Sequence, residues 1–163
     1  MTYANAVLPH ALYVAATCWP GEAFLKIAES SFSFLGRVTT VEDVFWPVGN
    51  CDWYPHGESK ALYDQQPVEA STMADAALTA FDATNHPDHL DTFRRAHLWF
   101  QGRNSLSLPL VDARSGSCFD ALQATGANRN QGAESTLAWL STALHNECLL
   151  QSNRDNPLAR TTR

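Results

Sequence analysis

The sequence predicts an all-α fold built from antiparallel helical hairpins that are joined by long loops. Apolar residues recur at helical spacing in five segments, and such a period is the main sequence signal for amphipathic helices. The order helix, short turn, helix, long loop occurs twice before a third such unit begins. The chain also lacks the strand–helix alternation and the glycine-rich phosphate loop that are typical of α/β enzymes.

The first two predicted helices form a hairpin. The first covers residues 3–17 and carries Pro9 in its opening turns, where the missing N–H of proline does least harm. A tight turn around Pro20 follows, and the second helix is predicted over residues 22–37, with a stripe of apolar side chains on one face. The two helices should therefore lie side by side and antiparallel.

Three further helices are expected downstream. Pro67 reads as the first residue of an alanine-rich helix over residues 67–83, because proline is favoured at that position. A short turn leads into a helix over residues 88–100, and the last helix is predicted over residues 133–149. Residues 151–163 are polar and are expected to form a flexible tail.

Two long loops, over residues 38–66 and 102–131, separate the helical units. Loops longer than about 15 residues are uncommon in compact domains unless they are functional or disordered, and the aromatic residues of the first loop argue against disorder. If successive helices are antiparallel, both loops end at the same rim, beside the first turns of the helices that begin at Pro67 and Ala133. That rim would gather eight polar residues: Asp52, Gln65, Gln66, Glu69, Asp120, Asn130, Gln131 and Glu134.

Composition limits the class of protein. A length of 163 residues, with 45% apolar and 17% charged residues, is typical of one globular domain. The formal charge of −6 argues against a nucleic-acid partner, because phosphate contacts require clustered Lys and Arg. No apolar run approaches the roughly 20 residues that cross a bilayer, so no membrane association and a cytoplasmic location are expected.

Neither metal chemistry nor serine hydrolysis is expected. The four cysteines are scattered without a C-x-x-C pair, and reduced, mostly buried thiols are the expectation for them. His86 and His89 are three residues apart, but Pro87 and Asp88 between them are typical of a helix start. The G-x-S-x-G elbow of serine hydrolases does not occur, and no cofactor is expected.

Four segments carry a family resemblance: NQGAESTLAWL, GSCFDAL, WFQGRNSLSLPLVDARSG and YDQQPVEAST. They resemble the C-terminal region of the six-hairpin, or (α/α)6-toroid, glycosidase-like domains of bacterial carbohydrate-active proteins, many of them associated with glycosyltransferases. The resemblance covers residues 1–150 and implies a helical toroid, sugar chemistry, and pocket roles for the QQPVE and NQGAE residues. A complete toroid needs on the order of 300 residues. The chain would therefore form a partial toroid, and the missing half or a second copy of the chain would complete it.

Glycoside cleavage usually needs two carboxyl groups, and Glu134 followed by Glu69 are the first candidates for catalysis. A small sugar or oligosaccharide is the expected ligand. The expected substrate-binding residues offer hydrogen bonds to sugar hydroxyls or a stacking surface: Gln65, Gln66, Asp52, Trp53, Asp120, Asn130 and Gln131. Trp46 and Tyr54 are additional stacking candidates.

Other interpretations of these residues stay open. Glu69 and Glu134 could serve only as first-turn acids that favour the helix dipole, and Asn130 or Gln131 could serve only as helix caps. The loop aromatics could pack the loops rather than bind a ring. The alternative function is accordingly a non-catalytic helical scaffold or interaction module associated with a glycosyltransferase.

Overall fold

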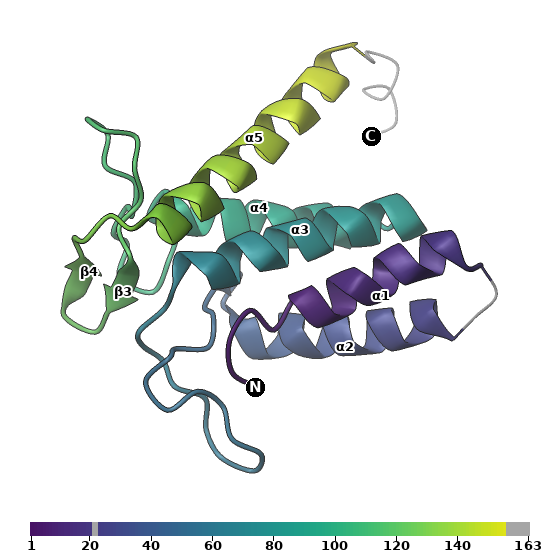
Figure 1. The fold of residues 1–163 in the computed structure, drawn as a ribbon, viewed down its shortest axis with the longest axis horizontal. Helices are drawn as coiled ribbons and strands as arrows, with labels where there is room; N and C mark the ends of the chain where they lie inside the picture. The colour runs from purple at the N-terminus through teal and green to yellow at the C-terminus, as the bar shows by residue number, and fades with distance from the viewer. Residues whose placement is uncertain (21–22, 156–163) are drawn as a thin grey trace.

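The fold is helix-rich, with two small β-hairpins in the long loops. The computed structural model describes residues 1–20 and 23–155 of the chain (Figure 1). Within this part the elements follow one another in the order α1 (Val7–Cys18), α2 (Phe24–Thr39), β1 (Thr40–Val41), β2 (Val44–Phe45), α3 (Pro67–Thr84), α4 (Asp88–Phe100), β3 (Ala121–Gln123), β4 (Gly126–Asn128) and α5 (Ala133–Asp155).

The helices form two layers. Helices α1, α3 and α5 contact one another in that order, while α2 packs against α1 and α4 packs against α3 (Figure 1). The two predicted hairpins, α1 with α2 and α3 with α4, are thus confirmed. The first turns of α3 and α5 lie at the same end of the molecule, where the long loops gather (Figure 1).

Helix α3 is the centre of the fold because its side chains are small. Its fully buried residues include the alanines Ala70, Ala74, Ala76, Ala77 and Ala80, and Ala96 of α4 is buried as well. Small side chains allow neighbouring helices to approach closely without leaving cavities. Helix α3 can therefore contact α1, α4 and α5 together.

Local sequence signals predict some helix ends better than others. Pro67 is the first residue of α3, as predicted, and Asn85 ends that helix in the left-handed conformation at φ 55°. Helix α1 begins at Val7 and not at residue 3, because Thr2 and Asn5 form a hydrogen-bonded turn before it. Helix α5 continues to Asp155, beyond the predicted end at residue 149; the rest of the predicted tail lies outside the described residues.

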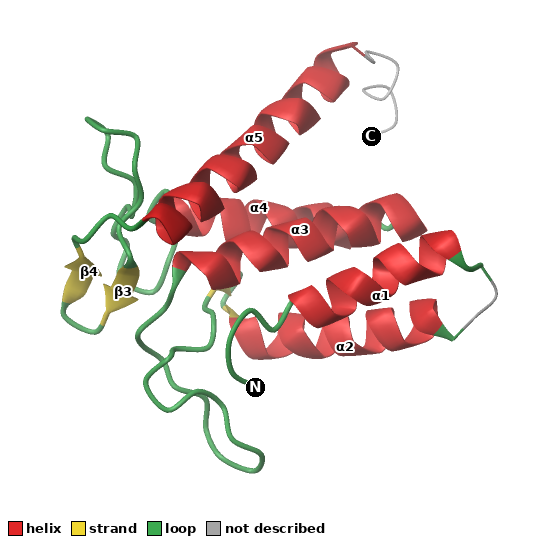
Figure 2. Cartoon of the chain, viewed as in Figure 1, coloured by secondary structure: helices red, strands yellow, loops and turns green. Residues whose placement is uncertain are grey.

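The prediction of a purely all-α chain is wrong in detail. Strands β1 and β2 pair antiparallel around Glu42 and Asp43, both at positive φ, and β3 pairs antiparallel with β4 (Figure 2). Positive φ at both turn residues is typical of tight hairpins. The strands are two or three residues long, which is too short for a period of two to stand out in the sequence.

Two further expectations concern the cysteines and membrane-spanning helices. All four cysteines are free, but only Cys118 is buried; Cys18, Cys51 and Cys148 are exposed, so the prediction of mostly buried thiols is wrong. Across residues 1–20 and 23–155, no helix combines the length and the apolar character that a membrane crossing requires.

Candidate functional site

The two long loops meet beside the first turns of α3 and α5. Gln65 and Leu122 exchange two backbone hydrogen bonds, with N···O distances of 2.9 and 2.8 Å, and so join the first loop to strand β3 of the second. This junction brings together the segments that precede both helices. It places Glu69 and Glu134, each in the first turn of its helix, at one end of the helical layer.

Glu69 is buried beneath the N-terminal segment. Its side chain is 7% exposed, and its Oε1 accepts a hydrogen bond of 2.6 Å from the backbone N–H of Ala4. Burial raises the pKa of Glu69, although hydrogen bonds from Ala4 and Asn5 oppose the effect. The carboxyl group therefore has the raised pKa that suits a general acid.

Glu134 is exposed and binds Tyr3 of the same N-terminal segment. Its Oε2 accepts a hydrogen bond of 2.6 Å from the Tyr3 hydroxyl. Partial burial, the bond to Glu134 and the negative charges of Glu134 and Glu69 together raise the pKa of Tyr3 to about 12. Tyr3 and Ala4 are adjacent in the chain and bind Glu134 and Glu69 respectively, so one short segment contacts both predicted catalytic residues although they belong to different helices.

Trp53 packs against Tyr3. Its ring is half-buried and lies edge-on to the ring of Tyr3, with a distance of 6.4 Å between the ring centroids. Asp52 precedes it on the exposed loop, and both residues have positive φ, 78° for Asp52 and 59° for Trp53. The N-terminal segment also pairs with this loop, because Met1 and Tyr54 exchange hydrogen bonds.

The Gln65 side chain joins the first long loop to α4 and to the second long loop. The residue is fully buried; its amide nitrogen donates to the Leu62 carbonyl and the Ser105 hydroxyl, both at 2.9 Å, and its amide oxygen accepts from the Trp99 indole at 3.0 Å. Its donors and its acceptor are engaged inside the protein. The neighbouring Gln66 is half-buried and precedes α3 as its N-cap residue in an extended conformation.

Asp120 organises the loop before α5. Its side chain accepts hydrogen bonds from the Gly132 backbone N–H at 2.7 Å and from the Asn130 amide. Partial burial raises the pKa of Asp120, but hydrogen bonds from Ser135, Gly132 and Asn130 outweigh this effect and leave the pKa below its usual range. Asp120 is therefore a carboxylate at neutral pH, and it holds Asn130 at the rim.

Gln131 faces a second set of polar groups. Its amide oxygen accepts from the Ser117 hydroxyl at 2.8 Å, and its amide nitrogen donates to Asp112 at 3.2 Å. Both Asn130 and Gln131 are exposed. Neither side chain contacts Glu69 or Glu134 through a hydrogen bond found among the described residues, so these two amides extend the polar surface rather than join the Tyr3 cluster.

Tyr3 and Ala4 are the residues that the sequence did not single out. Both were included in the first predicted helix, yet both precede α1; Tyr3 donates to Glu134 and Ala4 donates to Glu69. Asn5 was the available signal, because Asn favours caps and turns over helix interiors. For metals, residues 1–20 and 23–155 contain no group of three His, Cys, Asp or Glu side chains placed to hold an ion.

Comparison with known proteins adds no assignment. No protein-family model matches the chain, and no curated protein sequence matches it. The resemblance to six-hairpin glycosidase-like domains therefore stays a prediction from the segments named above.

Proposed function

We propose that this chain is a carbohydrate-active helical domain that binds a sugar or oligosaccharide at the rim between Glu69 and Glu134. The observation that supports this proposal most is that two adjacent residues of the N-terminal segment bind the two carboxyl groups, since the Tyr3 hydroxyl donates to Glu134 and the Ala4 N–H donates to Glu69. They occupy first turns of neighbouring helices, and rigid elements position catalytic groups more accurately than loops do. Trp53 beside Tyr3 and the exposed amides of Asn130 and Gln131, which extend the polar surface, suit a ligand made of hydroxyl groups.

The two carboxyl groups differ in the way that glycoside hydrolysis requires. Glu69 is buried and its pKa is raised, so it is the better acid for protonating a leaving-group oxygen. Glu134 is exposed, so it is the better base or nucleophile. In this proposal Trp53 offers an apolar face to the sugar ring, while Gln66, Asn130 and Gln131 bind hydroxyl groups, with Asp52 and Asp120 at the margin.

A ligand at this site must displace the N-terminal segment from Glu69 and Glu134. The Ala4 N–H bound to Glu69 and the Tyr3 hydroxyl bound to Glu134 occupy the places that sugar hydroxyls would take. A sugar can satisfy both carboxyl groups equally well, because a hydroxyl group donates hydrogen bonds of the same kind. Binding would then exchange these internal contacts for contacts with the ligand.

A partial toroid is part of the same proposal. Helices α1, α3 and α5, which contact one another in that order, would belong to the inner ring, with α2 and α4 in the outer ring. The remaining helices of the ring would come from another chain or from a second copy of this one. In that arrangement the rim between α3 and α5 would face the centre of the ring.

Calorimetric titration with a panel of mono- and oligosaccharides tests the proposal. We expect saturable binding of at least one glucose- or mannose-based sugar to the wild-type chain and roughly tenfold weaker binding for Glu69→Gln and Glu134→Gln, since each variant loses a charged hydrogen-bond partner. Glu147→Gln is the matched control, because it lies about 20 Å along α5 from Glu134 and should bind as the wild type does. Absence of heat with every sugar would reject the proposal.

A second candidate function is a non-catalytic scaffold or interaction module that accompanies a glycosyltransferase. It is favoured by a stripe of exposed leucines on α5: Leu137, Leu140 and Leu144 are 65, 51 and 63% exposed. These residues share one helix face, and α1 exposes Val7 and Val14 at the other edge of the same layer. Exposed apolar faces of this kind are typical of association sites.

Light scattering coupled to size exclusion tests the scaffold interpretation. The scaffold interpretation predicts concentration-dependent association of the wild-type chain and a monomer for the double variant Leu137→Ser, Leu144→Ser. Leu62→Ser replaces an exposed leucine of the first long loop and should leave association unchanged. A wild-type chain that stays monomeric at all concentrations would contradict the scaffold interpretation.

A further inference from the structure

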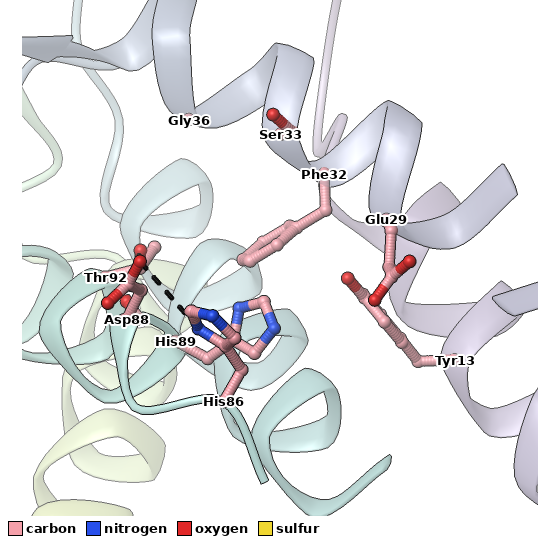
Figure 3. A pocket seen from close by; sticks show the side chains of 9 residues that line it. All are labelled: Tyr13, Glu29, Phe32, Ser33, Gly36, His86, Asp88, His89 and Thr92. Carbon is pink, nitrogen blue, oxygen red and sulfur yellow. Dashed lines mark hydrogen bonds and ion pairs between the residues drawn. The ribbon is translucent and has the colours of Figure 1, made fainter. Parts of the chain in front are cut away.

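A pocket of about 320 Å³ lies between α2 and α4 (Figure 3). Tyr13 of α1 lines it, Glu29 and Phe32 come from α2, and His89 comes from α4. Its volume lies at the lower end of the range of small-molecule sites. None of its lining residues belongs to the Glu69 and Glu134 cluster.

The Tyr13 hydroxyl is the unusual group in this pocket. The residue is 0% exposed, yet its hydroxyl oxygen has no hydrogen-bond partner among the described residues. Figure 3 shows the hydroxyl directed into the space between Glu29, Phe32 and His89. Buried polar groups almost always have a partner, so an unpaired hydroxyl that points into a pocket indicates a position for a ligand atom.

The charges of the pocket favour a cation. Glu29 and Asp88 contribute two carboxylates, and no Lys or Arg is found in the lining as the structure describes it. Burial and the neighbouring His86 lower the pKa of His89, so its ring is neutral at pH 7. The His86 ring lies 3.7 Å from the Asp88 carboxylate. An anion would therefore meet repulsion at neutral pH.

The apolar surface of the pocket is aromatic. The rings of Tyr13, Phe32 and His89 contact one another, with centroid distances of 5.9 Å for Tyr13 and Phe32, 6.1 Å for Tyr13 and His89, and 5.6 Å for Phe32 and His89. Such a surface packs against methylene groups and attracts an ammonium group through its ring faces. A metal ion fits less well, since no group of three ligating side chains converges in the described chain.

We infer that this pocket binds a small organic cation with a primary ammonium group and a short aliphatic chain. The ammonium donates hydrogen bonds to the Tyr13 hydroxyl oxygen and the Glu29 carboxylate, and the aliphatic chain packs against Phe32 and His89. This site does not depend on the proposed sugar site.

NMR titration with n-butylammonium at pH 7.5 tests the inference, with butyrate and 1-butanol as anionic and neutral probes of equal chain length. We expect saturable shifts of the Phe32 and His89 backbone amides with butylammonium only. Tyr13→Phe and Glu29→Gln should each weaken binding about tenfold, through loss of one hydrogen bond to a charged group. Glu147→Gln should bind as the wild type does.

Three outcomes would overturn the inference: equal binding of 1-butanol, wild-type affinity in Tyr13→Phe, or Zn²⁺ acting on the same amides in place of butylammonium. Glu29 is exposed, so Glu29→Gln keeps the fold and provides a test if Tyr13→Phe changes the packing of α1. Glu69→Gln and Glu134→Gln should leave butylammonium binding unchanged. That result would show that cation binding is independent of the sugar site, so that failure of one proposal does not affect the other.

Discussion

Replacing Trp99 with alanine is expected to destabilise the protein by about 3–5 kcal/mol, the usual cost of removing a buried aromatic side chain. Trp99 is fully buried, its ring lies edge-on to Phe100 with 5.2 Å between centroids, and its indole N–H donates to Gln65. The variant therefore creates a cavity and also leaves the Gln65 amide oxygen without a partner. Because domains of this size are stable by only about 5–15 kcal/mol, a large part of the free energy of unfolding is lost.

Urea denaturation followed by circular dichroism measures this change. Trp99→Phe is the matched control, since it keeps most of the apolar volume and removes the indole donor; a cost of about 1–3 kcal/mol is expected for the unpaired oxygen of Gln65. The hydrogen bond between Trp99 and Gln65 would have no stabilising role if neither variant lowered the free energy of unfolding. The same conclusion would follow if Trp99→Ala lowered it less than Trp99→Phe did.

Replacing Gly49 with alanine is expected to distort the first long loop and to cost about 3 kcal/mol. A Cβ atom at this position would lie 2.0 Å from the carbonyl oxygen of Tyr63. That oxygen belongs to the backbone and cannot rotate away. Gly49 also donates to the Ala61 carbonyl at 2.8 Å, and Asn50 donates to Asp64 at 3.0 Å, so the segments on both sides of the loop would separate.

Gly36→Ala is the control for this prediction. Gly36 lies inside α2, and the place that a Cβ atom would take there has no neighbouring atom within 4 Å. Alanine should therefore leave stability unchanged or raise it by about 0.5–1 kcal/mol. Thermal melting of both variants gives the comparison. A Gly49→Ala protein that melts at the wild-type temperature would mean that the two segments of the loop are not in close contact.

The helices could be predicted from the sequence because each carries its own signal. Pro67 begins α3, and apolar positions repeat at helical spacing in α2 and α4. The convergence of the long loops on one rim followed from the antiparallel order of the helices. These are local patterns, or consequences of chain order, so a single sequence is enough to read them.

The contacts of the rim could not be predicted because they depend on residues distant in sequence. Gln65 resembles a ligand-binding amide in isolation, and only the indole of Trp99, 34 residues away, shows that it serves the core. Tyr3 meets Glu134 across 131 residues. Short strand pairs such as β1 and β2 depend on a two-residue turn at positive φ, and its Glu-Asp sequence is not one of the usual signals for such a turn.

The pKa of Tyr3 tests most directly whether Glu69 and Glu134 share one site around this phenol. The 13Cζ resonance, assigned with Tyr3→Phe, can be followed by NMR as the pH rises. We predict a pKa of about 12 in the wild-type chain. It should fall in Glu134→Gln and fall further when Glu69→Gln is added, because each variant removes a negative charge that disfavours the phenolate. A Tyr3 pKa near its ordinary value that neither variant changes would contradict the shared site.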